Sequence, residues 1–257
     1  MQDKVAHTHC RSTEGMAMAS RLVAGLSAVL TLLLVLLVSP QESASQQQTK
    51  TYIWDGSYSF FDGQLIGGAQ WRCLWLGYGA GKVVRAQLWL QPLASTTLNE
   101  THSALVGSEF LLGANWDISV KVTTDKQLRT RKIGRKTVAA PNPWEVAWLV
   151  ADMAADGSAG IYFIFKPNGV ELGAYRGFGA EQIFLDTGST PVMKIGTTYS
   201  YRLVKNRTMV TALVDGAPVA AAPLAALGNW ALGNRIALYT EDAAVRFGPV
   251  TVTTSAP

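Results

Sequence analysis

The sequence predicts an all-β protein, a two-sheet antiparallel jelly-roll sandwich, and three observations favour this fold. Short runs rich in aromatic and β-branched residues recur along the chain, and Gly, Pro, Asn and Asp fill the gaps between them. Within residues 142–173, two such runs are joined by the turn residues Asp156-Gly157-Ser158. Along residues 116–123, apolar and polar side chains alternate, which is typical of a strand with one face on a core.

The expected strands follow one another at short spacing after a polar linker at residues 43–50. The length of the chain fits one such domain preceded by a leader. Only residues 223–227 favour a short helix, and their alanine-rich composition fits a covering loop equally well. In chain order, we predict strands at 71–76, 82–90, 103–106, 116–123, 144–150, 161–165, 198–204, 209–214, 235–239, 244–247 and 250–253.

The N-terminal residues have the pattern of an export signal. Residues 22–38 are almost purely aliphatic, Arg21 precedes them, and small polar residues follow at 39–45. The apolar run is also near the lower length limit for spanning a bilayer, so an uncleaved signal anchor is the alternative to cleavage, which we favour. The sequence therefore predicts a signal peptide or signal anchor at residues 1–45, a sandwich domain at residues 46–257, and a secreted or cell-surface protein.

The chain is basic, with a formal net charge of +4. The leader holds as many acidic as basic residues, so the positive balance belongs to the domain. Its densest basic segment runs from Lys126 to Lys136, for which a solvated loop is the favoured interpretation and contact with an anionic polymer the alternative. Nucleic acid is not an expected partner of an exported protein, which leaves acidic polysaccharide or an anionic membrane surface.

Cysteine usage predicts a domain without disulfides. Cys10 and Cys73 are the two cysteines, and Cys10 lies in the leader. Cys73 stands between Trp71 and Trp75 in an expected strand, so we predict a buried, unreactive thiol. Stability must then come from the core.

Several segments carry a resemblance to a known superfamily. They include WDISVKV at 116–122, PNPWEVAW at 141–148, FIFKPNGVELG at 163–173 and LYTEDAAVRF at 238–247. The chain resembles secreted domains of the concanavalin A-like lectin/glucanase superfamily, in particular its laminin-G-like and keto-disaccharide-hydrolase-like members, over nearly all of residues 54–253. The resemblance implies two curved sheets with a glycan bound on the concave one. The superfamily includes lectins, hydrolases, lyases and adhesion modules, so the resemblance implies the fold more than an activity.

The chain departs from the resemblance at the usual hydrolase motif. Family-16 glucanases carry three acids on one strand in the pattern Glu-x-Asp-x-x-Glu, and no segment of this sequence has that pattern. The standard hydrolase site of the superfamily is therefore not predicted.

Four residues are candidates for catalysis. Glu145 lies in an apolar run, where a carboxylate needs a partner or a function, and an ion pair with Lys166 or Arg129 or a hydrogen bond with Tyr162 is the favoured interpretation. If Glu145 and Glu171 faced each other across a groove, they could serve as acid and base for glycoside cleavage. Alternatively, Tyr162 or Lys166 could take a sugar-ring proton beside a uronate whose carboxylate Arg129 neutralises, as a lyase requires.

The candidates for ligand binding combine one aromatic residue with polar ones. Trp144 follows Pro143 at the start of an expected strand, where a ring is readily exposed, and sugar rings stack well on tryptophan. The basic and polar side chains of Arg129, Lys126 and Gln127 complete this set.

A structural calcium site is implied by the resemblance. Members of the superfamily often hold Ca²⁺ where the terminal strands meet, through acidic side chains and backbone carbonyls. The candidates here are Asp55, Glu241 and Asp242, and a solvated turn is the favoured alternative.

Three functions remain open from the sequence, and one is favoured. We predict an exported protein that recognises a polysaccharide on its concave sheet, with a membrane tether through residues 22–38 if the leader is not cleaved. The alternatives are a glycan-cleaving enzyme, either a glycoside hydrolase or a polysaccharide lyase, and a structural or adhesion module of a surface assembly.

Overall fold

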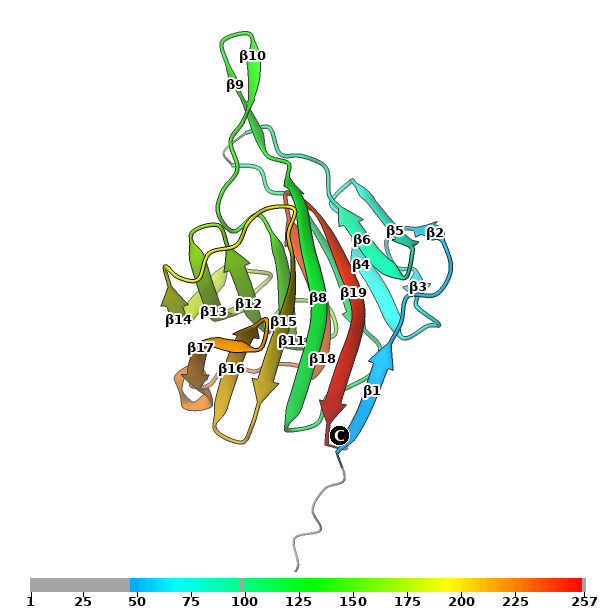
Figure 1. Cartoon of the computed structure of the whole chain (residues 1–257), viewed down its shortest axis with the longest axis vertical. Helices are drawn as coiled ribbons and strands as arrows, with labels where there is room; N and C mark the ends of the chain where they lie inside the picture. Colours follow the sequence, from blue (N-terminus) through cyan, green and yellow to red (C-terminus); the bar gives the residue numbers. More distant parts are fainter. Residues whose placement is uncertain (1–46, 98, 256–257) are drawn as a thin grey trace, which may run out of the picture. The chain divides into compact units, whose positions relative to one another are not determined.

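The computed structural model describes residues 47–97 and 99–255, which form two large antiparallel sheets and a separate two-stranded hairpin (Figure 1). The leader predicted at residues 1–45, and the domain boundary that follows it, lie outside the described residues. In the part of the chain that the structure describes, we find no helix with the length and apolar character needed to cross a membrane.

The first sheet, called the back sheet, is centred on two long strands. These are β8 (Trp116–Gln127) and β19 (Ala243–Thr254), which pair with each other. The order across the sheet is β17 (Ala217–Pro223), β16 (Met209–Val214), β15 (Thr198–Lys205), β8, β19, β6 (Gln87–Gln91), β5 (Ala80–Val84) and β2 (Tyr58–Phe60), and β1 (Gln48–Tyr52) also pairs with β19.

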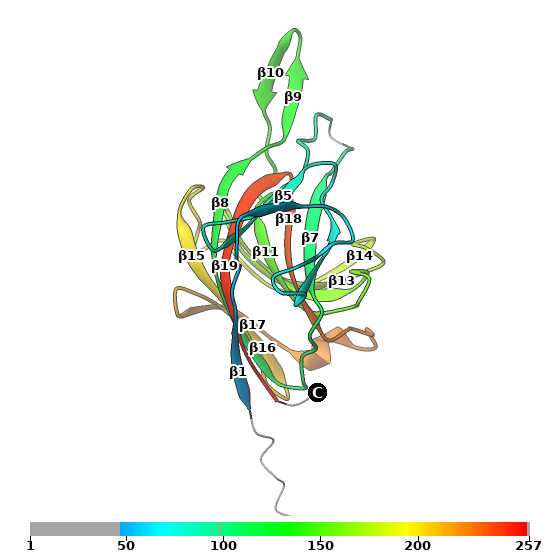
Figure 2. The ribbon, with the colours of Figure 1, turned by 90° about the vertical axis from the view of Figure 1, so that its right-hand side faces the viewer.

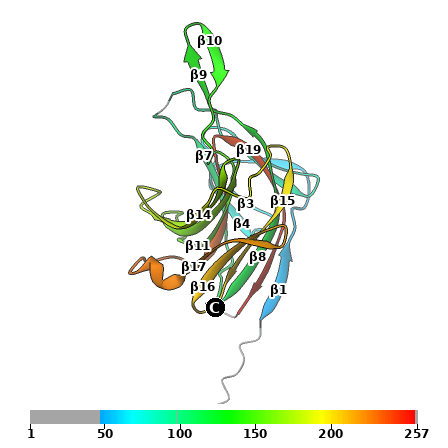
Figure 3. The same ribbon diagram turned by 60° about the vertical axis from the view of Figure 1, so that its left-hand side comes forward.

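The second sheet, called the front sheet, is built mostly from the middle of the chain. Its order is β14 (Glu181–Gly188), β13 (Gly169–Arg176), β12 (Gly160–Lys166), β11 (Ala147–Met153), β18 (Arg235–Glu241), β7 (Ser103–Ser108), β4 (Trp71–Trp75) and β3 (Leu65–Ile66). Figure 3 shows the two layers face to face, with β11 and β14 in one and β8 and β15 in the other.

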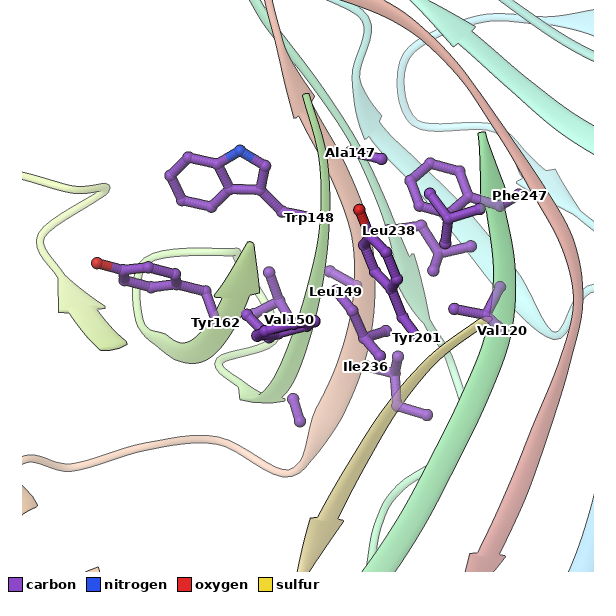
Figure 4. Close-up of a cluster of buried hydrophobic side chains, with 14 of the residues drawn as sticks. Val120, Ala147, Trp148, Leu149, Val150, Tyr162, Tyr201, Ile236, Leu238 and Phe247 are labelled. Atoms are coloured by element: carbon purple, nitrogen blue, oxygen red, sulfur yellow. The ribbon is translucent and has the colours of Figure 1, made fainter. Parts of the chain in front are cut away.

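The core lies between the two layers. On β8, the alternation seen in the sequence holds, because Trp116, Ile118, Val120 and Val122 are all buried. On the front sheet, Leu149 and Leu238 point toward the back sheet, whereas Trp148 and Tyr162 lie on the opposite side of β11 and β12 (Figure 4). Each large apolar side chain buried in this way contributes roughly 1.5–3 kcal/mol. The inner faces therefore hold the sheets together and leave the other set of side chains outside.

The predicted all-β sandwich is confirmed, and the differences lie at turns and in strands that were not predicted, among them β13 and β14. The expected strand 82–90 is two strands, because Arg85 and Ala86 form a tight turn with φ of 51° and 58°. Such positive φ values are usually signalled by Gly or Asn, which this turn lacks. The two expected C-terminal strands are one strand, β19, with a register shift between Phe247 and Val250. The short helix is a 3-10 turn at Leu224–Leu227.

The basic segment is mostly solvent-exposed, as the favoured interpretation expected, but it is a hairpin and not a loop. Strands β9 (Thr130–Ile133) and β10 (Lys136–Ala139) pair with each other and with no other strand of the described residues. Gly134 supplies the positive φ of 60° that the turn between them requires. The hairpin projects beyond the sandwich (Figure 2).

Candidate functional site

The outer face of the front sheet carries an ordered array of aromatic and polar side chains. Antiparallel pairing places Tyr239, Trp148, Ile164 and Glu171 in one row across β18, β11, β12 and β13. Because cross-strand partners share a face, this row faces away from the core together with Trp148. Three of the residues come from consecutive strands, and Tyr239 comes from a segment much later in the chain.

Two adjoining pockets lie on this face. One has a volume of about 170 Å³, and five of its twelve lining residues are aromatic. The other lies toward Trp144, and the two share Trp148, Gln182 and Glu241 in their walls. We call the combined depression the groove. It is lined by Trp75, Ser103, Leu105, Pro143, Trp144, Trp148, Val150, Gly157, Lys166, Asn168, Glu171, Tyr175, Phe178, Gly179, Gln182, Phe184, Tyr239 and Glu241.

The floor of the groove is a set of rings that hold one another. Trp148 lies at the centre, with its ring centroid 5.0 Å from that of Tyr162 and 5.1 Å from that of Tyr239. Its indole Nε1 donates a hydrogen bond of 2.9 Å to the backbone oxygen of Trp144, so the loop before β11 is fixed to the floor. At the rim, Phe178 and Phe184 keep most of their surface exposed. The groove thus offers rigid aromatic surfaces to a ligand.

A glycine positions one of these rings. A Cβ on Gly173 would lie 2.5 Å from Cζ of Tyr162, which is closer than two carbon atoms can pack. The bare backbone at Gly173 on β13 therefore leaves room for the Tyr162 ring, which lies tilted beside Trp148. The Tyr162 hydroxyl then reaches Glu171.

Three of the catalytic candidates meet at the groove, where Lys166 and Glu171 line it and the buried Tyr162 contacts Glu171. The Tyr162 hydroxyl donates a hydrogen bond of 2.8 Å to Glu171 Oε1, and Lys166 Nζ pairs with Glu171 Oε2. Burial, together with the charge of Glu171, raises the pKa of Tyr162 well above its ordinary value. Tyr162 is therefore a neutral hydrogen-bond donor at physiological pH, which does not suit the proton abstraction expected of a lyase.

Glu241 is a groove residue that the sequence suggested only as a metal ligand. The Tyr239 hydroxyl donates a hydrogen bond of 2.6 Å to Glu241 Oε1. Burial raises the pKa of Glu241 above its ordinary value, and the nearby carboxylates of Asp242 and Glu145 raise it further. The available signal was its position two residues after Tyr239, because residues at that spacing share a face of a strand.

The raised pKa of Glu241 predicts how stability depends on pH. A carboxyl whose folded pKa is raised stabilises the fold below its unfolded pKa of about 4.3, and this contribution is lost as the pH rises through the folded pKa. We therefore expect Glu241→Gln to raise the free energy of unfolding at pH 7 and to leave it nearly unchanged at pH 4, as measured by urea denaturation. The exposed Glu181, changed to Gln, is the control; an equal gain in that variant would contradict the prediction.

Glu145 lies in a closed cluster, apart from the groove. Strand β11 begins at Ala147, so Glu145 belongs to the preceding turn, and the expected strand from 144 is wrong at its start. Its carboxylate accepts hydrogen bonds from Arg129 Nε and from the backbone nitrogen of Asn142, the latter at 3.0 Å. Glu145 is fully buried, and burial raises its pKa. The structure thus gives Glu145 the ion pair that the sequence analysis favoured, and it does not form an acid–base pair with Glu171.

Arg129 also lies in this closed cluster, which corrects its expected place beside a ligand. Arg129 Nη2 bonds Asp242 Oδ2 at 2.8 Å, and Nη1 donates to the backbone oxygens of Thr97 and Glu100. The side chain is 3% exposed, so a ligand cannot reach it. We call Arg129, Glu145 and Asp242 the buried ionic cluster.

The other binding candidates are divided between the groove and the base of the hairpin. Trp144 lines the groove with 42% of its surface exposed, as its sequence context predicted. Gln127 uses its amide to donate a hydrogen bond of 2.8 Å to the backbone oxygen of Asn142. Lys126 is exposed near the base of the hairpin and does not line the groove. Neither Gln127 nor Lys126 is therefore placed beside a ligand in the groove.

The calcium candidates do not converge on one point. Asp242 uses its carboxylate to bind Arg129 and the backbone nitrogen of Ser95, whereas Glu241 is bonded to Tyr239 in the groove. Asp55 is exposed in the segment between β1 and β2. Within residues 47–97 and 99–255, no three His, Cys, Asp or Glu side chains gather as metal ligands would. These residues do not fit a shared calcium site, and calcium binding stays a prediction.

The cysteine prediction is confirmed for the domain. Cys73 is a free, buried thiol, and burial raises its pKa to about 12. At physiological pH the sulfur is protonated and unreactive.

Comparison with known proteins shows the fold. No protein-family model matches the chain, and no curated protein does. Among solved structures, it is similar to a carbohydrate binding module of Bacillus subtilis, with a TM-score of 0.52 and 12% identity over 72% of this chain and 96% of the other. A Bacillus subtilis protein of unknown function with a galectin-like fold has a TM-score of 0.51 and 10% sequence identity, and the match covers 81% of this chain and 100% of the other. β-agarase B of Zobellia galactanivorans has a TM-score of 0.50 and 7% sequence identity, and the match covers 84% of this chain and 98% of the other. The chain has the concanavalin A-like jelly-roll fold that the resemblance implied.

Proposed function

We propose that this concanavalin A-like sandwich binds a polysaccharide in the groove of its front sheet. The observation that carries the proposal is the groove itself, in which Trp148, Trp75 and Phe178 offer ring faces next to hydrogen-bonding side chains. The C–H faces of sugar rings stack on aromatic surfaces, and their hydroxyl groups need polar partners such as Gln182 and Glu241. The names of two similar structures, a carbohydrate binding module and an agarase, support the same class of ligand.

Export is part of the proposal. The apolar run at residues 22–38, with Arg21 before it, would direct the domain to the secretory route, where it would meet extracellular glycans. Cleavage would give a secreted protein, and retention of the run would give one tethered to the membrane.

Removing ring faces from the groove is expected to weaken binding. Soluble neutral and acidic polysaccharides are titrated into the purified full chain by calorimetry. We expect the chain to bind at least one glycan, and we expect Trp75→Ala and Phe178→Ala each to lower the affinity for it about tenfold or more, as for aromatic anchors in other interfaces. The control is Trp89→Ala, because Trp89 is a half-buried tryptophan on the outer face of the back sheet, where it packs on Lys82. Absence of binding across the panel, or an equal loss in the control, would remove the groove as the site.

Glycan cleavage is a second candidate, favoured by one observation. Glu171 and Glu241 both line the pocket at the Trp144 end of the groove, and the raised pKa of Glu241 suits a general acid. The same panel, incubated with the protein and assayed for new reducing ends, tests this function. New reducing ends that disappear in Glu241→Gln and in Glu171→Gln would establish cleavage. Glycan binding without new reducing ends would instead indicate a domain that binds glycan without cleaving it. An adhesion module would instead bind a protein with no dependence on sugar.

A further inference from the structure

The β9–β10 hairpin carries four cationic side chains that have no carboxylate partner among the described residues. Arg131, Lys132, Arg135 and Lys136 are all exposed, and none of them forms an ion pair there. The sequence holds no acidic residue between Asp125 and Glu145. By contrast, arginines on the sandwich surface do pair with carboxylates, as Arg72, Arg176, Arg202 and Arg246 show. The positive charge of the hairpin is therefore concentrated and uncompensated.

The register distributes this charge around the hairpin. Lys136 is opposite Ile133, and Val138 is opposite Arg131, so Arg131 and Lys136 lie on one face. Lys132 points to the other face, and Arg135 lies in the turn. Like charges on a lone two-stranded hairpin repel, and such hairpins are only marginally stable in water. A bound anion would remove that repulsion.

The base of the hairpin is held firmly. Arg129, the residue before β9, belongs to the buried ionic cluster. The backbone nitrogen of Thr130 donates a hydrogen bond of 3.0 Å to the oxygen of Ser95, and that of Ala140 donates one of 3.0 Å to the oxygen of Arg129. The cations are thus presented on a fixed arm that extends from the sandwich (Figure 2).

We propose that the β9–β10 hairpin is a second binding site, which contacts the carboxylate or sulfate groups of an acidic polysaccharide. Four unpaired cations on a projecting arm match a polymer with repeated anionic groups. A short connection of four residues joins β10 to Trp144 at the end of the groove. The choice of a polysaccharide rests on the proposed function, whereas the anionic character rests on the hairpin alone.

A membrane surface fits the hairpin less well. Ile133, at 55% exposure, is the large apolar side chain exposed at the tip. Binding in a lipid interface scales with the apolar area that is buried, and a single isoleucine offers little. Anionic vesicles and duplex DNA are therefore kept as competing outcomes of the test.

The test neutralises the hairpin in the full chain. Heparin serves as the sulfated probe, polygalacturonate as the carboxylated probe and dextran as the uncharged one. The variant carries Arg131→Gln, Lys132→Gln, Arg135→Gln and Lys136→Gln, and thermal unfolding checks that it folds. A matched control removes the same charge from dispersed, exposed cations through Lys50→Gln, Arg85→Gln, Lys121→Gln and Lys194→Gln.

We expect the hairpin variant to lose affinity for heparin or polygalacturonate by about tenfold or more at low salt, given the usual strength of exposed charge pairs. The wild-type affinity should fall steeply with salt, and the control should stay close to wild type. Equal affinity of the hairpin variant and wild type, or an equal loss in the control, would overturn the proposal. Tighter hairpin-dependent binding to phosphatidylglycerol vesicles or duplex DNA than to both acidic polysaccharides would overturn it as well.

The two proposals fail separately. If the groove binds glycan, Trp75→Ala should lower the affinity for an uncharged glycan. The hairpin variant should bind that same glycan as tightly as wild type. Loss of the hairpin site shows only with the acidic probes. If no uncharged glycan binds but the hairpin variant has a lower affinity for heparin than wild type, the groove proposal fails and the hairpin proposal stands.

Discussion

Replacing Arg129 by methionine is expected to lower the free energy of unfolding at pH 7 by about 3–5 kcal/mol, the range for a buried ion pair that loses one partner. Arg129 is the cation between Glu145 and Asp242, and all three side chains are buried. Methionine fills a similar volume but leaves two carboxylates without compensation in a low dielectric. The loss also frees the backbone oxygens of Thr97 and Glu100, which Arg129 binds at 2.8 Å. Urea denaturation monitored by tryptophan fluorescence measures the change.

The pH dependence of the Arg129→Met variant provides a second check. Burial already raises the pKa of Glu145, and removal of the guanidinium raises it further. A carboxyl with a raised folded pKa stabilises the fold below its unfolded pKa and loses this contribution as the pH rises. The cost of the substitution should therefore be smaller at pH 4 than at pH 7.

Arg202→Met is the matched control for Arg129→Met. Arg202 makes a two-point ion pair with Asp117, but its side chain is 46% exposed, so its loss should cost at most about 1 kcal/mol. If Arg129→Met lowers the free energy of unfolding no more than the control does, the buried ionic cluster does not stabilise the fold as predicted.

The fold was predictable where neighbouring residues along the chain carry the signal. Trp116, Ile118, Val120 and Val122 alternate with polar residues because β8 has one face on the core, and this pattern is visible without any partner strand. The turn at Arg85 and Ala86 was not predictable, because neither residue type signals a positive φ.

The candidate site was predictable in part, for the same reason. Tyr162, Lys166 and Glu171 were all candidates, and the short turn at Pro167 and Asn168 fixes their register along the chain. The neighbours of Trp148 across the sheet were not predictable, because Tyr239 is 91 residues away and register between distant strands depends on the whole core. Glu241 was therefore considered as a metal ligand, although it lies in the groove.

The hairpin shows a further limit of reading charge from the sequence. Arg129 and Arg131 are two residues apart in one basic run, yet Arg129 is buried between two carboxylates and Arg131 is exposed without one. What separates them is the position of Asp242, which lies in the bend between β18 and β19, over a hundred residues later in the chain. Composition could locate the cationic segment, but the fold decides which of its charges are free.

Replacing Trp148 by alanine is expected to affect both stability and binding. Trp148 is 6% exposed, and its ring contacts Tyr162 and Tyr239 while its Nε1 bonds the oxygen of Trp144. Loss of a buried tryptophan costs about 3–5 kcal/mol. Because the side chain forms the floor between both pockets of the groove, glycan affinity should fall by more than the roughly tenfold expected for a rim residue.

Two variants separate the contributions of Trp148. Trp148→Phe keeps a ring but removes the bond to the oxygen of Trp144, so it should retain most of the stability and lose part of the binding. Trp144→Ala removes an exposed ring from the same end of the groove, so it should weaken binding with little effect on unfolding. Affinities are compared at a temperature where unfolding curves show every variant folded. Because Trp148 lies on the groove side of β11 and lines both pockets, a folded Trp148→Ala protein with wild-type affinity would place the binding site elsewhere on the molecule.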